Sequence, residues 1–320
     1  MENYLEFEAK FHEKTAAKKT ANKVGMGTLL FLAFKNAALL IFSFLIIFIP
    51  GLYNLATDSV FNCLFSAFIS IFGFILCGLF AIKLQKRKVS EIIEFKKPKK
   101  YTGWLILVGM GVCMLANVIT GLVGSLLPFE PVINEIDAPT NLSGIVIYFI
   151  TTSVVPAFVE EFFYRGVVYG SFKKFGKMVA IVISSVMFSL IHGNLVQIPF
   201  AFVVGLILSF ITAEASSIWP AIIIHFLNNF MACTQTYVRI LFGDEISGFY
   251  FLIYGMIFVA LGLISIVIYS TKVKNNAFKL EKTPHVTSSG GLIKHILFSA
   301  SNIVFYIYVI ITVLQLQIAG

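Results

Sequence analysis

Long apolar stretches recur along the whole chain, and they limit its fold more than any other feature. An α-helix needs about 20 apolar residues to cross the hydrocarbon core of a membrane. Nine stretches approach or exceed that length, at residues 29–51, 60–82, 103–127, 143–163, 178–194, 196–213, 218–234, 249–270 and 292–316. Because backbone polar groups in lipid must be paired within the segment, such stretches favour helices. We therefore predict an all-α, polytopic transmembrane helical bundle with about nine spans.

The low content of charged residues agrees with a membrane protein and excludes several other classes of protein. Only 12% of the residues are charged, against about 25% in soluble globular proteins. This excludes a soluble enzyme, a disordered chain and a nucleic-acid-binding protein, although the net charge is +8. The expected surroundings of the chain are therefore the lipid bilayer, with no nucleic acid.

The basic residues are distributed unevenly between the predicted loops. If the N-terminus is cytoplasmic, the inside segments hold all 24 Lys and Arg residues except Lys35 and Arg239. The outside loops instead hold acidic residues: Asp58, Glu130, Glu135, Asp137, Asp244 and Glu245. Since short cytoplasmic loops of membrane proteins are enriched in Lys and Arg, this distribution predicts a cytoplasmic N-terminus.

The spans group into parts around a central region that carries most of the polar residues. We expect a basic cytoplasmic segment at 1–28, three spans with their loops at 29–142, a core at 143–234 and two spans at 235–320. Small residues at intervals of four allow helices to approach closely. Such pairs occur at Gly205 and Ser209 in the sixth span, and at Gly121 and Ser125 in the third.

Three clusters of polar residues interrupt the spans of the core. They are Glu160, Glu161 and Arg165 in the fourth span, His192 at the end of the fifth, and His225, Asn228 and Asn229 in the seventh. A charged residue inside a span costs at least about 2.5–3.5 kcal/mol, so its default interpretation is functional. Structural alternatives exist as well. Glu161 and Arg165 are spaced for an ion pair on one helix, and His225 and Asn229 for a link between helices.

The three clusters would satisfy one another if they met inside the bundle. With a rise of about 1.5 Å per residue, Glu160 lies about 20 Å above the cytoplasmic end of the fourth helix if that helix continues to about residue 172. His192 then lies at a similar height, about 22 Å. If the fourth helix stops near Glu161 instead, the carboxylates and His192 lie at opposite faces of the membrane. A shared chamber is therefore predicted only for the longer fourth helix.

The residue types in the clusters suit hydrolysis better than transport. Peptide hydrolysis needs an activated water and a stabiliser for the oxyanion. A glutamate shielded from bulk water suits general-base work, and Arg165 can orient the carboxylate of Glu161. His225 and Asn229 lie on one helix face and can donate two hydrogen bonds to an oxyanion. Two histidines and a glutamate are also a catalytic zinc set, so the spacing leaves both mechanisms open.

Three motifs carry a resemblance to a known family. They are Glu160-Glu161-x-x-x-Arg165, Phe188-x-x-x-His192 and His225-x-x-x-Asn229. Their order, intervals and placement on successive spans resemble those of the CPBP family of intramembrane proteases. That family includes the type II CAAX prenyl endopeptidase and the bacterial Abi proteins of bacteriocin processing or self-immunity. The resemblance covers about residues 143–234, which would form a CPBP-like catalytic core.

The resemblance implies an intramembrane endopeptidase that hydrolyses a peptide bond of a membrane-associated protein or peptide. It implies that Glu160 activates the water with help from His192, and that His225 and Asn229 stabilise the oxyanion. Glu161 and Arg165 would support Glu160. A zinc-dependent and a metal-free mechanism are both associated with the family. We favour the direct use of Glu160 and His192. If Zn²⁺ is present, its expected ligands are Glu160, His192 and His225.

Two other functions remain as alternatives at this level. The chain can be a non-catalytic membrane regulator or scaffold that retains the family fold, although a scaffold has no need of the complete polar set. A transporter with a mid-membrane polar site is the other alternative, but no internal repeat of the kind common in transporters is present. The compact chain without soluble domains suits a bacterial homologue, located as a multi-pass protein in the plasma membrane.

Overall fold

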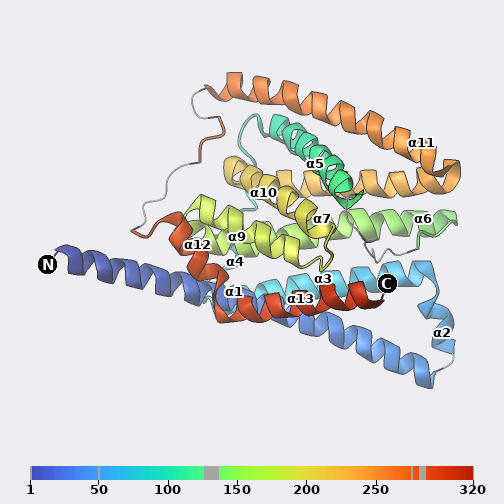
Figure 1. The fold of residues 1–320 in the computed structure, drawn as a ribbon, viewed down its shortest axis with the longest axis horizontal. Helices are drawn as coiled ribbons and strands as arrows, with labels where there is room; N and C mark the ends of the chain where they lie inside the picture. Colours follow the sequence, from blue (N-terminus) through green and yellow to red (C-terminus); the bar gives the residue numbers. More distant parts are fainter. Residues whose placement is uncertain (1, 50, 126–136, 275–276, 281–285, 320) are drawn as a thin grey trace.

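The computed structural model describes residues 2–49, 51–125, 137–274, 277–280 and 286–319. Every regular element in this part of the chain is a helix (Figure 1), which confirms the all-α fold class. Six helices are long and apolar enough to span a membrane, or seven if one bent pair counts as a span. The polytopic bundle is confirmed, whereas nine spans and a cytoplasmic N-terminus stay predictions. Glu130 and Glu135 lie outside the described residues.

The first third of the chain forms three long helices, and a short helix lies between each long helix and the next. The elements are α1 (Glu2–Phe48), α2 (Gly51–Ala56), α3 (Ser59–Leu84), α4 (Val89–Ile92) and α5 (Thr102–Ser125). The predicted cytoplasmic segment 1–28 is already helical from Glu2, because it is rich in the helix formers Ala, Lys and Glu. Asp58 caps the start of α3 by accepting a hydrogen bond of 2.6 Å from the Phe61 N–H.

The fourth span is one continuous helical run. Its parts are α6 (Leu142–Phe149), η1 (Ile150–Val154), α7 (Val155–Glu161), η2 (Phe162–Val168), α8 (Tyr169–Phe172) and η3 (Lys173–Phe175). The longer fourth helix is therefore confirmed, and the boundary at 163 is wrong. Segments η1 and η2 are π-helical. Pro156 lies in the first turn of α7 and has no N–H to donate, which favours a wider turn in η1.

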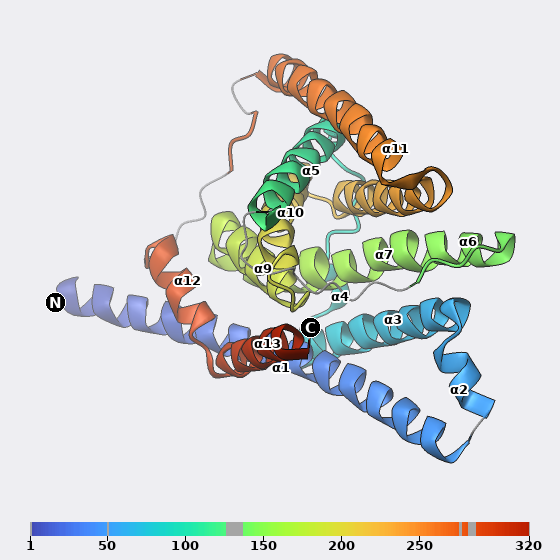
Figure 2. The same ribbon diagram turned by 45° about the vertical axis from the view of Figure 1, so that its right-hand side comes forward.

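The rest of the chain forms α9 (Lys177–Leu190), α10 (Gln197–Ala215), α11 (Trp219–Val273), α12 (Ser289–Leu297) and α13 (Ala300–Ala319). Helix α9 ends earlier than predicted, so His192 lies in the turn that follows it. Helix α11 contains the seventh and eighth predicted spans, and in Figures 1 and 2 it folds back on itself. Gly243 lies between its halves with φ +86°, a conformation that glycine adopts readily.

The core helices lie between two outer groups. Helices α1, α3 and α13 lie on one side of α7 and α9, and α5 and α11 lie on the other (Figures 1 and 2). The predicted close approach at Gly205 is confirmed, because a Cβ there would lie 3.0 Å from the Cα of Ser185 in α9. The same prediction for Gly121 is wrong, since nothing lies within 4 Å of a Cβ at that position.

Candidate active site

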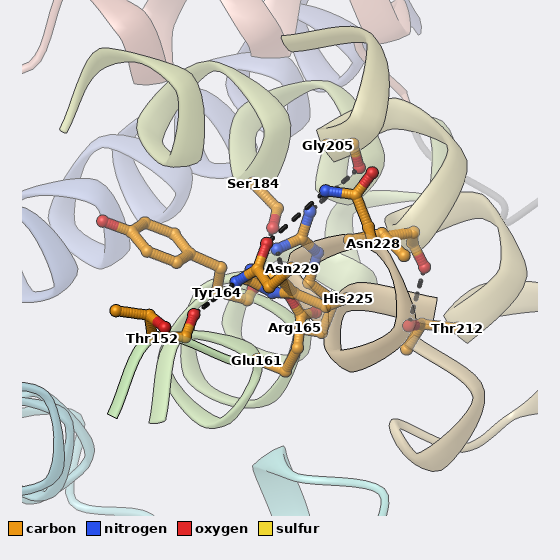
Figure 3. A network of polar contacts seen from close by, with 11 residues as sticks. Thr152, Glu161, Tyr164, Arg165, Ser184, Gly205, Thr212, His225, Asn228 and Asn229 are labelled. Carbon is orange, nitrogen blue, oxygen red and sulfur yellow. Dashed lines mark hydrogen bonds and ion pairs between the residues drawn. The ribbon is translucent and has the colours of Figure 1, made fainter. Parts of the chain in front are cut away.

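Glu161 is the centre of a buried ion network (Figure 3). Its Oε1 atom lies 2.8 Å from Arg165 Nη1 and 2.8 Å from His225 Nδ1. The exposed fractions of Glu161, Arg165 and His225 are 0%, 1% and 6%. The ion pair between Glu161 and Arg165 follows from their spacing, but the bond to His225 was not predicted. The network ties the fourth span to α11 in the interior of the bundle.

Arg165 joins two more helices to this network. Its Nη2 donates to the Gly205 carbonyl of α10 at 3.3 Å, and its guanidinium lies 4.3 Å from the centre of the Phe188 ring of α9. A guanidinium over an aromatic face is attracted by the negative charge density of that face. The edges of His192 and His225 also pack against this ring, with centroid distances of 5.3 and 5.9 Å. Phe188 therefore positions three of the site residues.

Asn229 lies half-buried one turn after His225 on α11. Its Nδ2 donates to the Thr152 carbonyl at 3.3 Å, and its Oδ1 accepts from Asn228 Nδ2 at 3.4 Å. Thr152 belongs to the π-helical segment η1. Sequence reasoning missed Thr152, because its part in the site comes from the backbone and a side-chain pattern gives no sign of it. Since an amide group has two hydrogens, one stays available for another acceptor.

Glu160 is the neighbour of Glu161 but opens into a different space. It lines a cavity of about 390 Å³, the Glu160 cavity, together with Ile191 and His192. The other walls come from α1 and α3: Phe31, Lys35, Leu39, Asn62, Phe65, Ser66, Ile69, Ser70 and Phe74. The Oε2 atom of Glu160 is buried and has no hydrogen-bond partner among the described residues. Such an atom points to a water or a substrate as its partner.

The walls of the Glu160 cavity include polar residues that sequence reasoning did not select. Asn62, Ser66 and Ser70 follow one another at intervals of four on one face of α3, and this spacing is the signal that could have found them. Lys35 of α1 forms no ion pair within the described part of the chain. The cavity therefore offers a carboxylate, an imidazole, an ammonium group and several neutral polar groups.

A second cavity of about 240 Å³ lies on the other side of His192, and we call it the His225 cavity. The predicted residues His225 and Asn229 line it, together with Asn117, Gln197, Asn228 and Gln235 among the polar groups. His192 is exposed and lines both cavities. Residues of all three polar clusters thus line these two cavities: Glu160 lines the first, His225 and Asn229 line the second, and His192 lines both.

In the zinc-dependent mechanism, Glu160, His192 and His225 would have to bind the same metal ion. Within the described ranges, no group of three His, Cys, Asp or Glu side chains is arranged to hold a metal ion. His225 already binds Glu161 through Nδ1, while Glu160 opens into the cavity that His225 does not line. The expected zinc ligands therefore do not form a set in this arrangement.

The matched family agrees with the position of these residues. Residues 142–231 match the family described as Type II CAAX prenyl endopeptidase Rce1-like. No curated protein and no solved structure gives a significant match to the chain. The matched stretch contains all of the predicted site residues: Glu160, Glu161, Arg165, His192, His225 and Asn229. Residues 142–231 are therefore similar to the Type II CAAX prenyl endopeptidase Rce1-like family, in agreement with the family that the motifs resemble.

Proposed function

We propose that this protein is an intramembrane endopeptidase that cleaves a membrane-associated protein or peptide in a bacterial plasma membrane. The observation that carries the proposal is the position of His192, which lines one cavity with Glu160 and another with His225 and Asn229. A water between Glu160 and His192 would thus be close to two groups that can stabilise an oxyanion. The family match supports a peptidase, since its members are described as endopeptidases.

In the proposed mechanism, Glu160 takes a proton from a water molecule while His192 orients that water. The resulting hydroxide attacks the scissile carbonyl carbon, and the negative charge moves to the carbonyl oxygen. The tetrahedral intermediate then collapses: the carbonyl re-forms as a carboxyl group, the C–N bond breaks, and Glu160 passes its proton to the leaving amine, so the carboxylate of Glu160 is regenerated. General-base catalysis of this kind contributes about 10²–10⁴-fold to a rate.

His225 and Asn229 would bind the oxyanion. Because Glu161 binds the Nδ1 atom of His225, only Nε2 is left to bind the oxyanion. In the imidazolium form both ring nitrogens carry a hydrogen, so Nε2 can then donate. Glu161 therefore fixes the orientation of the His225 ring through Nδ1. The second hydrogen of Asn229 Nδ2 supplies the other bond. Glu161 and Arg165 act as positioning residues that hold His225.

The proposal uses no metal, because the expected zinc ligands do not gather at one point. Metal analysis of the purified protein tests this part separately. Zinc bound in a one-to-one ratio, and lost together with activity on chelation, would replace the direct mechanism by a metal-dependent one.

The general-base role is tested by comparing membrane and secreted peptides from cells that produce the parent protein, Glu160→Gln or Glu94→Gln. Glu94 is the matched control because it pairs with Lys173 at 2.9 Å, away from both cavities. We expect products to disappear and precursors to accumulate only with Glu160→Gln, at an unchanged protein level. If Glu160→Gln cells show the same products as the parent, the protein acts without this base, as a regulator or scaffold would.

A further inference from the structure

Another cavity lies at the end of the bundle that the charge distribution assigns to the cytoplasm. Its volume is about 520 Å³, and four lysines line it: Lys99, Lys100, Lys177 and Lys279. We call it the lysine cavity. Its walls share no residue with the Glu160 cavity or the His225 cavity. The lysine cavity is therefore separate from the proposed peptidase site.

The lysines reach the cavity from three separate parts of the chain. Lys99 and Lys100 directly precede α5, Lys177 is the first residue of α9, and Lys279 follows α11. Within the described residues, neither Lys99 nor Lys279 forms an ion pair. The free N–H groups at the beginnings of α5 and α9 add positive potential at this end of the bundle.

One carboxylate belongs to the same cavity but does not balance the lysines. Glu214 is 7% exposed, and its Oε1 accepts a hydrogen bond of 2.7 Å from the Tyr269 hydroxyl. Glu214 is the one carboxylate among the described wall residues, and it accompanies Lys99, Lys100 and Lys279, so this part of the cavity carries a positive charge. Because like charges repel and opposite charges attract one another, an anion that enters the cavity would be attracted to these lysines.

We propose that the lysine cavity binds a phosphate-bearing anion at the cytoplasmic face. Lysine is a common phosphate ligand, and basic pockets between transmembrane helices on the cytoplasmic side suit anionic headgroups. The anion is the headgroup of an anionic lipid or a free phosphate compound. The lipid source is favoured because α10 and α11, which supply Glu214, Tyr269 and Val273 to the walls, are themselves apolar helices long enough to span the membrane.

The test uses the full chain with the substitutions Lys99→Gln, Lys100→Gln and Lys279→Gln combined. The matched control combines Lys83→Gln, Lys88→Gln and Lys97→Gln, which remove the same charge from exposed positions outside the cavity. Each protein is placed in nanodiscs of phosphatidylcholine, with or without phosphatidylglycerol, and thermal unfolding is recorded. Native mass spectrometry counts the phosphatidylglycerol molecules that stay bound. A third arm adds inorganic phosphate to the proteins in neutral detergent.

We expect phosphatidylglycerol to raise the Tm of the parent and the control by several degrees. In the cavity variant the affinity for the lipid should fall by more than about tenfold, because each lysine near the membrane surface contributes to binding. Stabilisation by inorganic phosphate alone, lost only in the cavity variant, would support the same site with a free phosphate as ligand. Equal effects of both probes on all three proteins, or no effect on the parent, would overturn the proposal.

Discussion

The Glu160 cavity and the His225 cavity share His192 but are built from different parts of the chain. Most walls of the Glu160 cavity come from α1 and α3, which lie outside residues 142–231. Most walls of the His225 cavity come from within that matched stretch, with additions from α5 and the second half of α11. The candidate site residues therefore lie within the matched stretch, whereas the space in front of Glu160 depends on helices outside it.

This difference gives the first spans a role that their residues alone did not reveal. Lys35, Asn62 and Ser66 line the same cavity as Glu160. The ion network of Glu161, Arg165 and His225 lies in the interior and stabilises the site without lining the Glu160 cavity. We therefore expect substitutions in the ion network to affect stability. Substitutions in the His225 cavity should affect turnover, and substitutions in the Glu160 cavity should affect substrate affinity.

The largest effect is expected from Arg165→Met, which removes the partner of a fully buried carboxylate. Loss of one member of a buried ion pair costs about 3–5 kcal/mol, because the other charge stays uncompensated. The measurement is the free energy of unfolding of the purified protein in detergent. Arg87→Met is the control, since the pair of Arg87 with Glu91 at 3.4 Å is partly exposed and contributes at most about 1 kcal/mol. Equal losses for both variants would contradict the buried network.

Asn229→Ala tests the His225 cavity. Removal of one oxyanion donor lowers kcat by about 10²–10³-fold, and this loss should be the same for every substrate. Asn117→Ala removes an amide from the opposite wall of the same cavity and should change kcat by much less. Steady-state kinetics of the two variants make the comparison. A loss for Asn117→Ala as large as that for Asn229→Ala would show a general effect of cavity polarity instead.

Gly205→Ala tests the packing that brings α10 to Arg165. A methyl group there would press on Ser185 at 3.0 Å, and overpacking of this kind costs about 1–3 kcal/mol. Gly121→Ala is the matched control, because its Cβ meets nothing within 4 Å and alanine favours helices over glycine by about 1 kcal/mol. Thermal unfolding should show a lower Tm for the first variant and an unchanged or higher Tm for the second.

The smallest effect is expected from Lys35→Gln in the Glu160 cavity. Loss of this ammonium group should raise KM about fivefold for substrates with a carboxylate near the cleaved bond, which corresponds to about 1 kcal/mol. Neutral substrates and kcat should be unaffected. Lys83→Gln at the end of α3 serves as the control. If kcat falls for neutral substrates too, Lys35 takes part in the chemistry and not only in the selection of substrate.

Parts of the site follow from spacing along one helix, and these parts were predictable. Residues four apart share a helix face, so the pairing of Glu161 with Arg165 could be stated in advance. The need of each polar cluster for a partner, together with similar depths along a long fourth helix, also indicated that the clusters meet. By contrast, the two adjacent glutamates could not be assigned to different surroundings from spacing alone. Successive helix positions point about 100° apart, and the π-helical turns on both sides of α7 change which neighbour each one faces.

The sequence by itself determined the helical membrane fold and the family that residues 142–231 resemble, and it supplied the residues of the candidate site. The physical reason is that lipid permits few backbone structures and makes every ionisable residue in a span conspicuous. Only the tertiary structure decided that Glu161 holds His225, that α1 and α3 enclose Glu160, and that four lysines surround one cavity. These contacts join residues far apart in the chain, and their free energies depend on packing that no local pattern records.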